Sequence, residues 1–259
     1  MELTYLRKTV NVQISWSNQL DKLLPDLFRI DGNQNFIHEF VTPYLTPGAL
    51  VYDVGGGKQP MIPVASKAQL GIQVVGLDID EKELHSAPAG AYDATVCCDI
   101  TKYQGNADGD VVICQALLEH VTNVADALRA IDSILKPGGV ALLFVPSANA
   151  LYAKLNLLMP ERLKRAILFW VFPKASRVQG FRAYYDRCTP REIKRLAGKC
   201  GLLTERLRLY YHSNYFAFVT PLYALWRIWS LAFYMLDREQ AAETFSVALR
   251  KPALSVFGD

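Results

Sequence analysis

The stretch VYDVGGGKQP, residues 51–60, decides how the rest of the chain is interpreted. It begins with a short apolar run of the kind that forms a buried strand, and three consecutive glycines follow. Glycine tolerates the positive φ of a tight turn and lets a ligand approach the backbone closely. The stretch therefore predicts a strand, a glycine-rich turn and a helix start, which together open a βαβ unit.

Apolar runs alternate with amphipathic segments from about residue 49 to residue 146, which is typical of βαβ units and a parallel sheet. We expect strands at 49–54, 72–77, 94–98, 110–114, 139–145, 202–211 and 244–250. A helix at 124–135 should stop at the sequence KPGG, and another should run from Thr189 to Cys200 before Gly201. The fold class is thus α/β, with a doubly wound sheet.

Length and composition favour a single domain with elaborations. The 259 residues are 51% hydrophobic, which suffices for one full core, whereas two independent domains would be cramped. We divide the chain into an N-terminal helical segment at 1–48, a core at 49–146, and insertions at 147–188 and 212–242. Both insertions follow strands, the fifth and the sixth, at the carboxyl ends where this architecture binds ligands.

The charge and cysteine patterns exclude several classes of protein. The 28 basic and 25 acidic residues leave a net charge of +3 and alternate without a long basic run, so we expect no nucleic-acid partner. The five cysteines match neither a zinc site nor a disulfide framework, so we expect reduced thiols in a cytoplasmic protein and no metal site. The start of the chain lacks the pattern of a secretory signal.

Three acids stand where the first three strands end. Asp53 precedes the glycines, Asp78 closes the second strand in GLDID, and Asp99 closes the third in CCDI. The ends of these strands converge on one crevice in a doubly wound sheet. Asp78 could accept hydrogen bonds from both hydroxyls of a ribose, and Asp99 could take an adenine amine or simply cap the turn that follows it.

The residues around the glycines indicate which class of nucleotide cofactor the turn would bind. The GxGxxG pattern of dinucleotide-binding enzymes requires glycine where Pro60 stands. A dehydrogenase also normally has a neutral residue in place of Asp53, whereas an acid there suits the cationic amino-acid part of another cofactor. Hydride transfer with NAD is therefore the minor interpretation.

Five motifs resemble, in order and spacing, those of class I S-adenosylmethionine-dependent methyltransferases, including ubiquinone-type and many small-molecule enzymes. They are VYDVGGG, GLDID, CCDI, DVVICQALLEHV and LKPGGVALLFVPS, and the likeness covers about residues 35–146. The resemblance implies a Rossmann-like seven-stranded sheet of order 3-2-1-4-5-7-6 with helical caps after strands five and six. One departure is Lys58, which stands where the family more often has the last glycine of GxGxG.

The same resemblance implies which residues hold the cofactor, S-adenosylmethionine. From the methionine part through the ribose to the adenine they are Asp53, Gly55, Gly56, Gly57, Asp78, Ile79, Asp99 and Ile100. Gln115, at the end of the fourth strand, could hold the cofactor through its main-chain carbonyl or present its amide to the acceptor.

The segment ICQALLEHV should lie at the mouth of the crevice, beside the methyl donor. His120 is a candidate general base for the acceptor proton, because an imidazole titrates near neutrality, or else a packing residue at the edge of the sheet. In the resembling ubiquinone-type enzymes an acid four residues before the histidine joins a glutamate and the histidine in holding a divalent ion. Glu119 and His120 match that pattern, but Ala116 replaces the first acid, so we expect no metal dependence.

The acceptor site is expected to include Arg182, Tyr184 and Tyr185, although these tyrosines could equally be packing residues. They lie in a stretch, 180–202, that resembles family members acting on sugars and on lipid-linked or natural-product acceptors. We therefore expect transfer of a methyl group to a small, hydrophobic or lipid-linked acceptor, with oxygen favoured. Methylation of nitrogen or carbon and a catalytically silent cofactor-binding subunit are the alternatives.

Each insertion contains an aromatic-rich apolar stretch, at 163–177 and at 215–236. The second approaches the roughly 20 residues of a spanning helix, but a span there would separate strand 244–250 from its sheet. We expect residues 163–172 and 221–236 to lie together above the crevice.

Two interpretations of these apolar segments remain open. They could touch the cytoplasmic face of a membrane, with Trp226, Arg227 and Trp229 at the depth of the lipid headgroups. They could instead form an apolar lid and the contact face of a homodimer.

Overall fold

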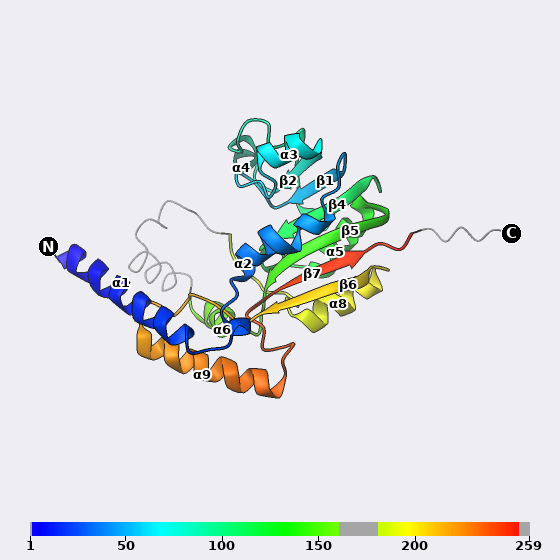
Figure 1. Cartoon of the computed structure of the whole chain (residues 1–259). Helices are drawn as coiled ribbons and strands as arrows, with labels where there is room; N and C mark the ends of the chain where they lie inside the picture. The colour runs from blue at the N-terminus through cyan, green and yellow to red at the C-terminus, as the bar shows by residue number, and fades with distance from the viewer. Residues whose placement is uncertain (1, 161–180, 254–259) are drawn as a thin grey trace.

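A seven-stranded sheet of order β3-β2-β1-β4-β5-β7-β6 runs through the molecule (Figure 1). The computed structural model describes residues 2–160 and 181–253. The strands are β1 Leu50–Val54, β2 Gln73–Asp78, β3 Ala94–Cys97, β4 Gly109–Gln115, β5 Leu135–Pro146, β6 Leu203–Tyr210 and β7 Thr244–Arg250. Neighbouring strands from β3 to β5 are parallel, and β7 runs antiparallel to β5 and β6. The predicted order and class of the sheet are thereby confirmed.

Helices cover both faces of the sheet and extend beyond it (Figure 1). They are α1 Glu2–Asp21, α2 Gly32–Asn35, α3 Val64–Leu70, α4 Glu81–His85, α5 Val124–Ile134, α6 Leu151–Leu158, α8 Pro190–Lys199 and α9 Thr220–Leu236. Short helical turns lie at Asp26–Phe28, Phe36–Phe40, Thr42–Tyr44, Ile100–Lys102 and Leu118–His120. The face of the sheet under α5 and α8 carries one large apolar cluster, and the opposite face packs against Phe36 and Phe40.

Two of these helices begin at side-chain caps, of which the sequence indicated the one at Thr189. The side chain of Asn123 accepts the first amides of α5, and Thr189 accepts the amide of Glu192 at the start of α8. The stretch KPGG ends α5 as expected, but it belongs to β5, which begins at Leu135 and pairs with Gly109. The glycine turn there brings the chain straight from the helix back into the sheet.

Helix α9 lies beside α1, on the opposite side of the molecule from α3 and α4 (Figure 1). The two helices are joined where Ser17 donates a hydrogen bond to the carbonyl of Ala217 at 2.9 Å, and Gln13 accepts the amide of Thr220 at 2.8 Å. β7, which follows α9, pairs with both β5 and β6, so 221–236 does not cross a membrane. Within residues 2–160 and 181–253, no helix combines the length and hydropathy that crossing a bilayer requires.

The inward face of α9 carries the one charged side chain of the helix beside apolar core residues, which corrects the expected placement of two residues. Trp226 is only 1% exposed and donates its indole N–H to Glu243, and Arg227 is 5% exposed. The Arg227 guanidinium bonds to Asp21 at 2.8 Å and to the carbonyls of Tyr211 and Phe28. Placing either residue at headgroup depth was therefore wrong, because a buried acid on α1 holds the arginine inside.

The outward face of α9 is apolar over its whole length. Its exposed side chains are Pro221, Leu222, Leu225, Ile228, Trp229, Ala232, Met235 and Leu236. Within Thr220–Leu236 the sole charged side chain is that of Arg227, which points inward. The helix therefore turns its charge toward the protein and an apolar face toward solvent, the opposite of an ordinary surface helix. Residues 163–172 lie outside the described residues, so their predicted pairing with α9 stays a prediction.

Candidate functional site

A pocket of about 260 Å³ opens between the glycine turn after β1 and the end of β4. Its lining residues are Asp53, Gly55, Gly56, Gln59, Met61, Gln115 and Ala116. Gly55 has φ of 80°, and a Cβ on Gly56 would lie 2.5 Å from the carboxylate of Asp53. Glycine is thus required at both positions, once for backbone conformation and once for space.

Asp53 is the buried acid of this pocket. It is 3% exposed, and its Oδ2 accepts the amide of Met61 at 2.7 Å and the hydroxyl of Tyr92 at 3.4 Å. Burial raises the pKa of Asp53 to about 6, against these two hydrogen bonds, which lower it. Within the described residues no basic side chain forms an ion pair with it, so the acid is left for a cationic ligand.

Asp78 ends β2 and faces the same glycine turn. Its Oδ1 accepts the amide of Asp80 at 2.9 Å, and a Cβ on Gly57 would lie 3.1 Å from its Oδ2. Burial and the nearby acids Glu83 and Asp80 raise the pKa of Asp78. The third glycine thus keeps the approach to this carboxylate open.

Lys58 is accommodated by an ion pair across the turn. Its Nζ lies 2.8 Å from Oε1 of Glu83 on α4. The lysine side chain therefore turns outward, toward an acid, and leaves the pocket to the glycines. This explains how the turn tolerates a residue other than the usual glycine.

Asp99 lies two residues past the end of β3 and caps the short turn that follows. Oδ1 of Asp99 accepts hydrogen bonds from the backbone amide of Thr101 at 2.9 Å and from the hydroxyl of Thr101 at 2.8 Å. The hydrogen bond from the hydroxyl contributes most to lowering the pKa of Asp99. Among the described residues, the one polar partner of Oδ2 is Lys102, whose Nζ lies 3.8 Å away. The capping role considered from the sequence is therefore real, and one oxygen remains for a ligand. Ile100 beside it is buried, whereas Ile79 after Asp78 is exposed.

The end of β4 brings a residue that sequence reasoning missed next to the pocket. Gln115 donates from Nε2 to Oδ1 of Asn33, on α2, at 3.1 Å. The next residue, Ala116, has φ of 51°, a strained conformation for alanine in the pocket wall. No motif marks Asn33 in the sequence, because the segment before β1 follows no pattern that relates it to the glycine turn.

In the turn Leu118–His120, called the LEH turn below, the buried titratable residue is Glu119 rather than His120. It is 4% exposed, and burial raises its pKa to about 8. Its Oε2 has no hydrogen-bond partner in the part of the chain that the structure describes. His120 is partly exposed; its Nδ1 lies 3.1 Å from the carbonyl of Arg182, and its Nε2 lies 3.7 Å from Glu119. Sequence reasoning weighed Glu119 only as a metal ligand and missed its burial.

The expected acceptor residues meet around this turn. The carbonyl of Glu119 accepts the amides of Tyr184 and Tyr185, at 2.7 and 3.0 Å, and the Arg182 guanidinium stacks on the ring of Tyr184. Tyr185 is buried with φ of 53°, and Tyr184 is exposed. The structure thus brings His120, Arg182 and both tyrosines together.

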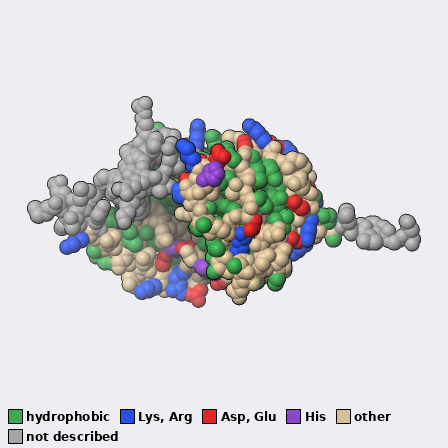
Figure 2. Space-filling view, turned by 90° about the horizontal axis from the view of Figure 1, so that it is seen from above, with side chains coloured by type: hydrophobic (Ala, Val, Ile, Leu, Met, Phe, Trp, Pro, Cys, Tyr) green, Lys and Arg blue, Asp and Glu red, His purple; other side chains and the backbone are tan. Residues whose placement is uncertain are grey.

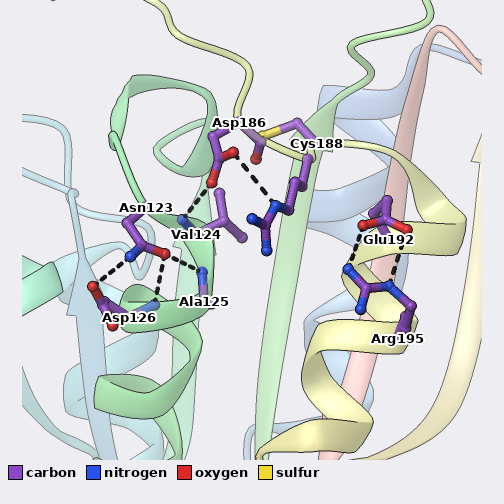
Figure 3. A network of polar contacts seen from close by, with 9 residues as sticks. Asn123, Val124, Ala125, Asp126, Asp186, Cys188, Glu192 and Arg195 are labelled. Atoms are coloured by element: carbon purple, nitrogen blue, oxygen red, sulfur yellow. Dashed lines mark hydrogen bonds and ion pairs between the residues drawn. The ribbon is translucent and has the colours of Figure 1, made fainter.

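Asp186 anchors this segment to the start of α5. Its Oδ2 accepts the amide of Val124 at 3.1 Å, next to the cap made by Asn123 (Figure 3). The segment that contains Asp186 is thus tied to α5, the helix that follows the turn after β4. This contact fixes the distance between the LEH turn and residues 182–185.

Three other features of the described residues bear on possible ligands: the surface charge, the cysteines and the groups that could hold a metal ion. Figure 2 shows basic and acidic side chains interspersed on the face in view. The five cysteines are free thiols. Among residues 2–160 and 181–253, no group of three or more histidines, cysteines and acids is arranged to hold a metal ion.

Comparisons with known proteins agree with this geometry. The family model described as a methyltransferase domain matches residues 52–143. Over 191 residues the chain is 30% identical to a ubiquinone biosynthesis O-methyltransferase of Xanthomonas axonopodis, covering 68% of this chain and 74% of the relative.

Solved structures show the same fold. One is an S-adenosylmethionine-dependent methyltransferase of Methanosarcina mazei, with TM-score 0.52, 15% identity, and coverage of 83% of this chain and 98% of that one. Another is phosphoethanolamine N-methyltransferase 2 of Haemonchus contortus in complex with S-adenosylmethionine. It has TM-score 0.51 and 18% identity, and the match covers 85% of this chain and 52% of that one.

Proposed function

Since the chain belongs to the class I S-adenosylmethionine-dependent methyltransferases, we propose that this enzyme methylates an oxygen of a small hydrophobic or lipid-linked acceptor. The observation that carries the proposal is the buried carboxyl of Glu119, which lies beside His120 where the acceptor residues meet. The relative named as an O-methyltransferase supports oxygen as the acceptor atom.

The pocket residues suit the cofactor, S-adenosylmethionine, part by part. The unpaired acid Asp53 suits the α-ammonium, and the backbone of Gly55, Gly56 and Gly57 allows close approach. For the ribose we propose Asp78, with Ile79 beside it, and for the adenine the free oxygen of Asp99 and the amide of Ile100. Gln115 faces the methionine part.

When bound, the cofactor supplies an activated methyl group on its sulfonium sulfur, so alignment of the acceptor accounts for much of the rate. The residues of this chain then have to hold the acceptor and receive its hydroxyl proton. We propose that Arg182, Tyr184 and Tyr185 hold it, and that His120 takes the proton on Nε2. The carbonyl of Arg182 orients the ring through Nδ1, and the carboxyl of Glu119, kept neutral near pH 7 by burial, lies 3.7 Å from Nε2.

The outer face of α9 supports a hydrophobic acceptor delivered from a membrane surface. Its exposed side chains are uniformly apolar, and Trp229 has the aromatic character found at bilayer interfaces. An apolar face of this length on a soluble monomer indicates a partner. We propose that the partner is the membrane, with a second copy of the chain as the competing outcome.

The acceptor is tested with a methyl-labelled donor on phenol, amine, sugar and lipid fractions. We expect label on oxygen in the organic-extractable fraction. Label on nitrogen or carbon would overturn O-methylation, and a protein that binds the cofactor without turnover on any fraction would be a silent subunit.

The membrane contact is tested by flotation with anionic liposomes. We expect the wild type to float and the double variant Leu225→Glu, Trp229→Glu to stay in the soluble fraction. Asn18→Glu, at an exposed position of α1, adds a charge elsewhere and should float like the wild type. If the wild type never floats and the double variant dissociates an oligomer, α9 is a subunit interface.

A further inference from the structure

We propose that Asn33, from the N-terminal segment, is a cofactor-binding residue that donates to the α-carboxylate of the amino-acid part. The proposal rests on the assignment of the Asp53 pocket to that part of S-adenosylmethionine. It gives a binding role to a residue that lies outside the methyltransferase motifs, 20 residues before Asp53.

Asn33 is held beside Gln115, a residue of the pocket wall, by its neighbours on α2. Gly32 packs so closely on the sheet that a Cβ would lie 2.6 Å from Oγ1 of Thr244 and 2.9 Å from the ring of Tyr210. Asn35 is buried and accepts the hydroxyl of Tyr210 at 2.8 Å. These contacts fix the backbone of α2, so the exposed side chain of Asn33 carries none of the packing.

The hydrogen bond between Asn33 and Gln115 uses one donor of Gln115 and the amide oxygen of Asn33. Within the described residues, Nδ2 of Asn33 and Oε1 of Gln115 make no hydrogen bond to protein. Since Gln115 lines the pocket, the pair leaves one donor and one acceptor free beside the pocket wall. An amino-acid zwitterion needs both, a donor for its carboxylate and acceptors for its ammonium.

The charges of the pocket assign the two ends of that zwitterion. The buried acid Asp53 suits the ammonium, and no lysine or arginine is among the residues that line the described pocket. The carboxylate therefore depends on neutral donors. The candidates are Asn33 with its partner Gln115, and Gln59, which also lines the pocket.

The experiment compares two ligands by calorimetry. S-adenosylhomocysteine carries the amino-acid part, and 5′-methylthioadenosine lacks both its ammonium and its carboxylate. We expect Asn33→Ala to lower the affinity for S-adenosylhomocysteine about 10-fold, as for loss of a charge-assisted hydrogen bond. The affinity for 5′-methylthioadenosine should not change. Asn33→Asp should weaken S-adenosylhomocysteine further, because it sets an acid against the carboxylate.

The matched control is Gln34→Ala, at the next exposed position of α2, which should bind both ligands like the wild type. Unchanged binding in Asn33→Ala, with a loss in Gln59→Ala, would overturn the proposal in favour of Gln59. Tighter binding by Asn33→Asp would reverse the orientation of the zwitterion and also overturn it. A wild type that binds 5′-methylthioadenosine and S-adenosylhomocysteine equally would instead refute the assignment of the pocket.

Discussion

Replacing Asp53 by asparagine should change stability and cofactor binding in opposite directions. Burial raises the pKa of this carboxyl from 3.8 to about 6. Between these two values the unfolded chain releases the proton and the folded protein keeps it, so folding stability falls as pH rises and levels off above about pH 6. A shift of about two units corresponds to roughly 3 kcal/mol. The asparagine side chain would avoid this cost, because its amide is neutral and its oxygen can still accept the amide of Met61.

The assay is thermal unfolding of Asp53→Asn and wild type from pH 5 to pH 8, without ligand. We expect a higher Tm for the variant at pH 8, by up to about 6–10 °C for a chain of this size, and a difference that shrinks toward pH 5. Titration with S-adenosylhomocysteine should show the reverse order, with affinity at least about 10-fold weaker because the ammonium loses its acid. A variant that is less stable than wild type at pH 8 and binds the ligand normally would refute the reasoning.

Three other variants test further contacts described above. Arg227→Ala should lower the free energy of unfolding by about 3–5 kcal/mol, because it removes the buried guanidinium that pairs with Asp21. That acid is left with Tyr223 and His212 as partners. Denaturant unfolding measures this, and a loss below about 1 kcal/mol would mean that the pair is effectively solvated. The stability advantage of Glu119→Gln over wild type should grow as pH rises from about 4.5 toward 8, because the pKa of Glu119 is raised to about 8. A Tm difference between the two proteins that stays constant over this pH range would contradict the burial effect. His120→Ala should lower turnover about 100-fold and leave ligand affinity and Tm intact, and a chelator should not change the rate, whereas full activity of the variant would remove His120 from catalysis.

The sequence predicted the sheet well because each strand carries its own signal. Strand 244–250 was placed on the residues that β7 occupies, since β-branched and aromatic residues end there at a lysine and a proline. The positions of the three acids could be predicted because they stand at or near the ends of strands, and the ends of parallel strands meet at one edge of the sheet. These are local relations, which a single sequence contains.

The parts that were missed depend on contacts between distant segments. Helix α9 is apolar nearly all round, so its sequence does not tell which face is buried, and the acid that draws Arg227 inward lies 206 residues away. Asn33 reaches Gln115 across 82 residues. The burial of Glu119, beside a more exposed His120, likewise comes from the backbone contacts of residues 184 and 185.

The central claim is that the crevice formed by β1, β2 and β3 binds S-adenosylmethionine. Calorimetric titration of the wild type and Asp78→Ala with S-adenosylhomocysteine and with NAD tests it most directly. We predict that the wild type binds S-adenosylhomocysteine and not NAD. Asp78→Ala should lose about 30- to 1000-fold in affinity, equivalent to two charge-assisted hydrogen bonds to the ribose. Unchanged affinity in Asp78→Ala, or preferential binding of NAD, would contradict the account.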